Sequence, residues 1–132
     1  MSINLNVKLD QSKTPWALDI DQTNNSNQVG RSPDAQSIVW QLTGNAATGN
    51  FVSLTDPNPG FQWIGTAPPS GIFGLPSLSS NSNQLTLSDL NNSTSNTGTF
   101  VYLLRANIGG SVYSTIRTLP GGTTTDPAII NK

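Results

Sequence analysis

The sequence contains neither cysteine nor histidine. Without cysteine the chain has no disulfide framework, no thiolate metal site and no cysteine nucleophile. Without histidine it also lacks the Ser-His-Asp and Cys-His arrangements of covalent catalysis. We therefore expect a protein that is not an enzyme, with no catalytic residues, no metal site and no cofactor.

Charge is almost as scarce. Only 10% of the residues are charged, the net charge is -1, and all seven acidic residues are aspartates. Six basic residues spread along the chain provide no electrostatic footprint for nucleic acid. No run approaches the roughly 20 apolar residues of a membrane span, and residues 1–10 contain no apolar signal-peptide region. We expect no nucleic-acid or membrane partner, and the compartment stays open.

Asn, Ser, Thr and Gly are abundant, whereas Glu is absent and Lys is rare. The straight-chain residues that favour helices are therefore few. Asn, Asp and Gly suit turns, because they tolerate left-handed backbone geometry. With 132 residues, we expect a single domain over residues 1–132 with almost no helix.

The stretch 85–119 organises the chain. Residues 85–87 alternate, 91–98 are turn formers, 107–110 form a turn, and 112–119 alternate again. Between the two turns, residues 99–106 are apolar on both faces. A strand that is apolar on both faces belongs in the middle of a packed sheet, so we expect residues 100–104 at the centre of the fold.

Alternation also predicts strands in the first third of the chain. Residues 3–9 give the clearest half-buried strand, which we expect along an outer position. Residues 16–21 and 37–42 form two further strands, the second with Trp40 on its apolar face. The polar, turn-rich stretch 23–35 is expected to be a long loop.

The remaining strands are short. Residues 50–54 and 61–66 are predicted strands, and residues 129–130 indicate a last strand near the end of the chain. This makes about seven to nine short strands separated by turn signals, with no repeat. An antiparallel β-sandwich is the economical way to bury their apolar faces.

The stretch 67–76 is rich in proline and glycine. Its prolines cannot donate to a sheet ladder, so we expect an edge, a bulge or a loop there. Its apolar residues Ile72, Phe73 and Leu75 are expected to cover the open end of the core.

Residues 85–90 (LTLSDL) followed by 96–102 (NTGTFVY) resemble the E–F region of immunoglobulin-like domains. In this resemblance Phe100 takes the aromatic corner position and Tyr102 takes the place of the second cysteine. Residues 38–40 resemble strand C with its core tryptophan, and 16–21 are the candidate for strand B. The resemblance implies an immunoglobulin-like antiparallel β-sandwich, an architecture that hosts many unrelated roles.

The closing residues 126–131 (DPAIIN) are similar to the ends of small uncharacterised bacterial proteins of the DP-EP family. This chain contains no Glu-Pro dipeptide. The resemblance implies a stand-alone bacterial sandwich of unknown role.

Carboxylates and tryptophans are the candidate site residues. Asp19 and Asp21 share one strand face about 7 Å apart. They are interpreted as solvated aspartates, a glycosidase pair, or, with Gln22 and Asn24, calcium ligands. Trp16 and Trp63 either both pack inside the fold or, if exposed beside Asn, Asp or Gln, form a sugar-stacking platform, because a rigid ring gains contact area at little entropic cost. The candidate ligand-binding residues are therefore Trp16, Trp63, Asp19 and Asp21.

Three functions remain open. The leading hypothesis is a non-catalytic module that mediates protein contact or self-association, because few Lys or Glu residues guard its strand edges. The alternatives are a carbohydrate-binding module that uses exposed tryptophan, and a phage or cell-surface structural subunit suggested by the Asn-, Thr- and Gly-rich composition.

Overall fold

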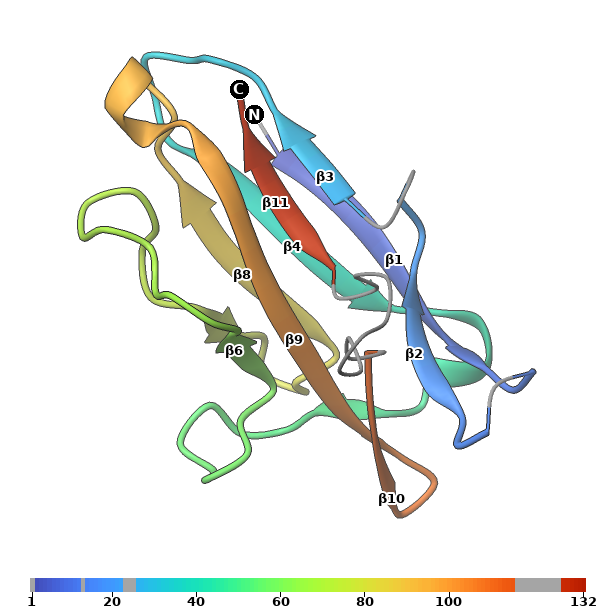
Figure 1. Cartoon of the computed structure of the whole chain (residues 1–132). Helices are drawn as coiled ribbons and strands as arrows, with labels where there is room; N and C mark the ends of the chain where they lie inside the picture. The colour runs from blue at the N-terminus through green and yellow to red at the C-terminus, as the bar shows by residue number, and fades with distance from the viewer. Residues whose placement is uncertain (1, 13, 23–25, 116–126) are drawn as a thin grey trace.

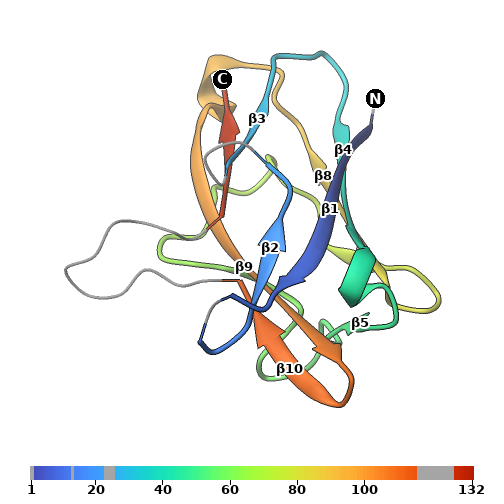
Figure 2. The same cartoon turned by 90° about the vertical axis from the view of Figure 1, so that its right-hand side faces the viewer.

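The computed structural model describes residues 2–12, 14–22, 26–115 and 127–132. This part of the chain forms eleven strands in two sheets, and its helical elements are the 3-10 turns η2 (Gly44–Ala46) and η3 (Thr94–Asn96). Figure 2 shows the two layers, with β1, β4 and β8 in one and β9 and β11 in the other. The predicted all-β sandwich, with almost no helix and no disulfide, is confirmed. Across the described ranges, no helix has the length and apolar character needed to cross a bilayer.

The first sheet has the order β2-β1-β4-β8-β7. Its strands are β1 (Ser2–Asp10), β2 (Ala17–Ile20), β4 (Gln36–Leu42), β7 (Ser77–Leu78) and β8 (Gln84–Asp89). The prediction that residues 3–9 lie along an outer position is wrong, because β1 pairs with β2 on one side and β4 on the other. Alternation of apolar and polar residues indicates that one face of a strand is exposed to solvent. It does not indicate how many neighbouring strands pair with it.

The second sheet is built around β9 (Gly98–Ile108). Its other strands are β3 (Ser26–Val29), β5 (Asn50–Phe51), β6 (Phe61–Trp63), β10 (Ser111–Ser114) and β11 (Ala128–Asn131). β9 pairs with four of them, namely β5, β6, β10 and β11. Tyr102, Leu103 and Leu104 are all buried, so both faces of β9 are covered at its middle and its predicted central position is confirmed.

Both sheets are mixed. β1 runs parallel to β4, and β11 runs parallel to β3, whereas the other pairs are antiparallel. The prediction of one loop over 23–35 is wrong, because β3 lies within it and buries Asn27 and Val29. The polar sequence of β3 carries no apolar alternation, and its backbone pairing with β11 makes it a strand.

Proline and glycine keep the stretch 67–76 outside the named strands, as predicted. Ile72 is buried and Phe73 is half-buried, but Leu75 is 94% exposed. The prediction that Leu75 covers the core is therefore wrong. Leu75 stands between Gly74 and Pro76 on the outer side of the loop, and the sequence pattern of a loop does not specify side-chain direction.

The core lies between the sheets and is centred on Trp40 and Tyr102. Trp40 is fully buried as predicted, and its ring lies 5.3 Å from that of Tyr102, centroid to centroid. The Trp40 Nε1–H donates a hydrogen bond to Tyr102 Oη at 3.1 Å. Burial raises the pKa of the Tyr102 hydroxyl, so this group stays neutral. The pair therefore joins β4 of one sheet to β9 of the other.

The pairing of two strands differs from what the immunoglobulin resemblance implies for them. β4 pairs with β8, whereas the resemblance implies that it pairs, as strand C, with β9. β6, which carries Trp63, is the strand that pairs with β9 in this way. β2, the strand B candidate, pairs with β1 at the sheet edge. A core tryptophan can point inward from either sheet, so its pattern alone does not identify the strand.

Three expected features lie partly outside the described residues. The predicted strand 112–119 corresponds to β10 over Ser111–Ser114, and residues 116–119 are not described. Asp126, the first residue of the closing DPAIIN motif, and Asn24, a proposed calcium ligand, also lie outside the described ranges. The last strand expected at residues 129–130 is β11.

Candidate functional site

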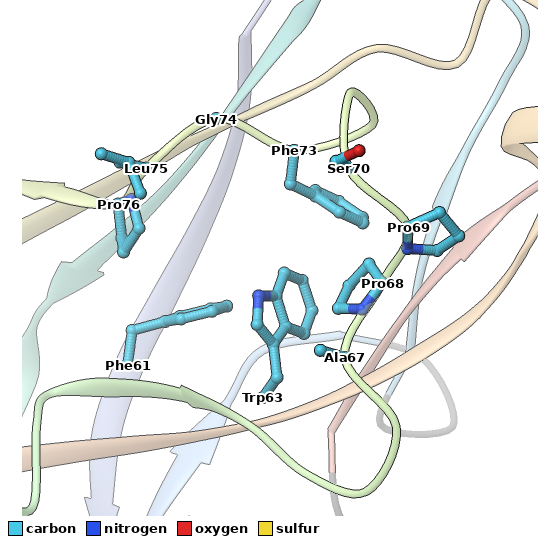
Figure 3. A pocket seen from close by; sticks show the side chains of 10 residues that line it. All are labelled: Phe61, Trp63, Ala67, Pro68, Pro69, Ser70, Phe73, Gly74, Leu75 and Pro76. Atoms are coloured by element: carbon cyan, nitrogen blue, oxygen red, sulfur yellow. The ribbon is translucent and has the colours of Figure 1, made fainter.

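An aromatic hollow of about 320 Å³ opens beside β6, and we call it the Trp63 hollow. Its lining includes Phe61, Trp63, Pro68, Pro69, Phe73 and Pro76 (Figure 3). β6 contributes the first two rings, and the proline-rich stretch 67–76 contributes the rest. The prolines prevent this stretch from continuing the sheet, so it folds over β6 and leaves a concave surface.

The rings of the hollow pack against one another. Phe61 lies 4.9 Å from Trp63 in an edge-to-face arrangement, and Trp63 lies 4.7 Å from Phe73. Phe73 in turn meets Phe100 edge-to-face at 5.1 Å. Phe61 also stacks on the buried Tyr102 at 5.5 Å. Because these rings are continuous with the core, the floor of the hollow is held in one arrangement before any ligand arrives.

Backbone hydrogen bonds hold the stretch 67–76 against β8. The Leu90 N–H donates to Ile72 O at 2.8 Å, and the Gly74 N–H donates to Ser88 O at 3.1 Å. Gly74 also sits so close to Ser88 that an added Cβ would collide with the Ser88 hydroxyl oxygen. A larger residue here would require the Ser88 hydroxyl to rotate away, and the neighbouring Leu75 projects from the anchored loop.

The chemistry of the Trp63 hollow suits apolar contact. None of its lining residues carries a charge, and Ser70 and the Trp63 indole N–H provide its side-chain polar groups. Such a lining offers surface for burial and no carboxylate or imidazole for proton transfer. In the described ranges, no group of three or more His, Cys, Asp or Glu side chains could hold a metal ion.

A second aromatic surface, the Trp16 ledge, is lined by Thr14, Pro15, Trp16 and Tyr113 and encloses about 340 Å³. Trp16 precedes β2 and Tyr113 lies on β10, so the ledge spans the edges of both sheets. The two rings are stacked at 6.0 Å with an interplanar angle of 27°. Trp16 is 43% exposed, as the sugar-platform hypothesis requires.

The four candidate site residues do not form one site. Trp63 lies on β6 and Trp16 precedes β2, and Figure 1 shows these strands on opposite sides of the sandwich. Asp19 is exposed on β2 opposite Lys8 of β1. Asp21 is also exposed, just beyond β2, where its backbone N–H donates to Asn6 O at 2.9 Å. This arrangement places the aspartates on the solvated face of the sheet.

Sequence reasoning missed a buried polar cluster, the Asp89 cluster, formed by Asp89, Asn91 and Asn131. The Asn131 amide donates to Asp89 Oδ1 at 2.9 Å and to Asn96 O at 3.0 Å. The Asn91 amide donates to Val29 O and to Lys132 O, both at 3.0 Å. These bonds tie β11 and β3 to the end of β8.

A signal for this cluster exists in the sequence. Asp89 continues the alternation of Leu85 and Leu87 and so falls on the buried face of β8. Burial raises the pKa of its carboxyl above the ordinary value, and the hydrogen bond from Asn131 partly opposes this shift.

Comparison with known proteins gave no match, neither to a protein-family model nor to a curated protein. Of the surfaces described above, the Trp63 hollow combines concavity, rigid aromatic walls and absence of charge. The Trp16 ledge is the second candidate, and the Asp89 cluster is closed to solvent.

Proposed function

We propose that this chain is a non-catalytic immunoglobulin-like module that mediates protein contact, including self-association, through the Trp63 hollow. The observation that carries the proposal is an uncharged aromatic hollow with a projecting leucine at its rim. Aromatic side chains are enriched at protein interfaces and charged ones are depleted from interface centres.

The strand pairing supports the immunoglobulin-like part of the proposal. β4 pairs with β8 and β6 pairs with β9, in separate sheets, as strands B with E and C with F do in immunoglobulin domains. β9 and β10 form a hairpin that corresponds to F and G. The ring of Tyr102 occupies the core where the second cysteine would lie. The similarity of residues 126–131 to the DP-EP family leads us to propose a bacterial origin.

Sedimentation equilibrium tests the protein-contact function. We expect reversible association of the full chain between about 5 and about 500 µM, the range of weak protein contacts. Replacing Ala67 by Arg places a charge at an exposed position in the hollow and should abolish the association. The matched control Ser111→Arg, at an exposed position on β10, should leave the association unchanged. A chain that stays monomeric throughout and captures no partner would refute the proposal.

A second candidate function, carbohydrate binding, is favoured by the Trp16 ledge. The half-exposed ring of Trp16, stacked on Tyr113, gives a flat apolar surface of the kind on which sugar rings stack. Titration of the chain with oligosaccharides should quench tryptophan fluorescence, and Trp16→Ala should remove this quenching. If no sugar changes the fluorescence, this candidate is eliminated. A phage or cell-surface structural subunit is supported by composition alone.

A further inference from the structure

Leu75 and the Trp63 hollow belong to one continuous surface. Leu75 is 94% exposed, yet it lines the hollow at its rim. Figure 3 shows Leu75 and Pro76 on one side of the hollow and Pro68, Pro69 and Phe73 on the other, with the Leu75 side chain turned away from the Trp63 ring. The surface therefore carries both a protruding apolar side chain and an apolar cavity.

We infer that the occupant of the Trp63 hollow is Leu75 of a second copy of this chain, and that the two copies form a two-fold symmetric dimer. A two-fold contact brings the same surface of both copies together, so that surface must complement itself. A knob beside a hole satisfies this condition, because each Leu75 enters the other copy's hollow. The inference rests on the proposed protein-contact function and names its partner.

The size of the hollow admits this occupant, and the absence of charge favours it. The hollow of about 320 Å³ exceeds the roughly 150 Å³ cavity that deletion of a buried leucine side chain leaves in a protein core. Because none of the lining residues is charged, two identical surfaces meet without like-charge repulsion. A strongly charged partner would gain no ion pair from this lining and would leave its own charges unpaired.

The fixed geometry on both sides lowers the entropic cost of association. The ring contacts of Trp63 with Phe61 and Phe73 hold the hollow open. The hydrogen bond from Gly74 to Ser88 anchors the loop immediately before Leu75. Preorganised groups lose less conformational freedom on binding. More of the favourable free energy of apolar burial therefore contributes to affinity.

Leu75→Ser tests the inference by sedimentation equilibrium on the full chain. The dimer dissociation constant should rise by about 100-fold, because each leucine contributes about tenfold and a two-fold contact contains it twice. Val112→Ser is the matched control, since Val112 is 57% exposed on β10. This control should dimerise as the wild type does. Circular dichroism and thermal unfolding should show both variants folded, because neither side chain is buried.

The outcomes separate this inference from the proposed function. Association that Leu75→Ser leaves unchanged would overturn the inference and leave the protein-contact function standing. A wild-type chain that is monomeric at all concentrations would overturn both. Open-ended oligomers in place of dimers would also overturn the inference, because a two-fold contact closes on itself.

A cross-link provides a second test. The chain contains no cysteine, so single introduced cysteines are unique. A mixture of Leu75→Cys and Ser70→Cys chains should form a disulfide between the two variants under mild oxidation, since Ser70 lines the hollow. The mixed dimer keeps one inserted Leu75, so at protein concentrations above its roughly tenfold weakened dissociation constant we expect it to exceed the disulfide dimers of either variant alone. Equal, slow cross-linking of all three would contradict insertion of Leu75 into the partner's hollow.

Discussion

Replacing Asp89 by asparagine should stabilise the sandwich at neutral pH. Asp89 is fully buried at the end of β8, and its Oδ1 accepts one hydrogen bond, from the amide of Asn131. Among the described residues, its Oδ2 has no hydrogen-bond partner. Asparagine keeps the shape of the side chain and an oxygen that accepts from Asn131. The substitution therefore removes a buried charge without opening a cavity.

The pH dependence follows from the direction of the pKa shift. Burial raises the pKa of Asp89 above 3.8, so the folded chain holds the proton more tightly than the unfolded chain does. The contribution of this proton to stability is fully present below pH 3.8 and is lost as the pH rises through the pKa of the folded state. Above that pKa the folded state bears the cost of the buried carboxylate.

The expected gain follows from replacing a buried charge by a neutral amide, which still leaves one polar group without a partner at the position of Oδ2. An unsatisfied buried group destabilises a fold by about 1–3 kcal/mol and by more when it is charged, and one hydrogen bond from Asn131 offsets part of this. We expect Asp89→Asn to raise the free energy of unfolding by about 1–2 kcal/mol at pH 7. At pH 3, where the carboxyl is protonated in both states, the two proteins should be nearly equal.

Urea unfolding of the wild type and the variant, at intervals from pH 3 to pH 7, measures this difference. Asp34→Asn is the control, since Asp34 is exposed and its neutralisation should give no comparable gain. The reasoning is refuted if Asp89→Asn destabilises the chain at pH 7. It is also refuted if the difference between variant and wild type does not grow as the pH rises.

Three further substitutions test the core, the loop and the ledge. Tyr102→Phe removes the acceptor of the Trp40 indole N–H and should cost about 1–3 kcal/mol in urea unfolding; an unchanged midpoint would mean that this hydrogen bond is dispensable. Gly74→Ala should cost under about 1.5 kcal/mol in urea unfolding, because the new methyl group meets the Ser88 hydroxyl, which can rotate to another rotamer. The same substitution in a Ser88→Ala background should cost less, and an equal cost there would argue against the contact. Trp16→Ala should change stability by under about 1 kcal/mol, since the ring is 43% exposed, and a much larger loss in thermal unfolding would identify Trp16 as structural.

The sequence could predict part of the candidate site. Trp63 was identified as a candidate because aromatic rings on short strands are either core or binding surface. The hollow around it could not be predicted, because it depends on hydrogen bonds from the stretch 67–76 to β8, about fifteen residues further along the chain. The exposure of Leu75 has the same origin. No local pattern specifies on which side of an anchored loop a side chain projects.

The sequence by itself determined which residues form strands and which faces are buried. Alternation has a period of two residues and is a local property, so β1, β4, β8 and β9 could be recognised, with Trp40 in the core. Only the tertiary structure decided which strands are neighbours: the parallel pairs, the interior position of β1 and the strand β3 within a polar stretch. Strands pair through backbone N–H and C=O groups, and every residue except proline has both. The side-chain pattern therefore does not specify which strands pair with each other.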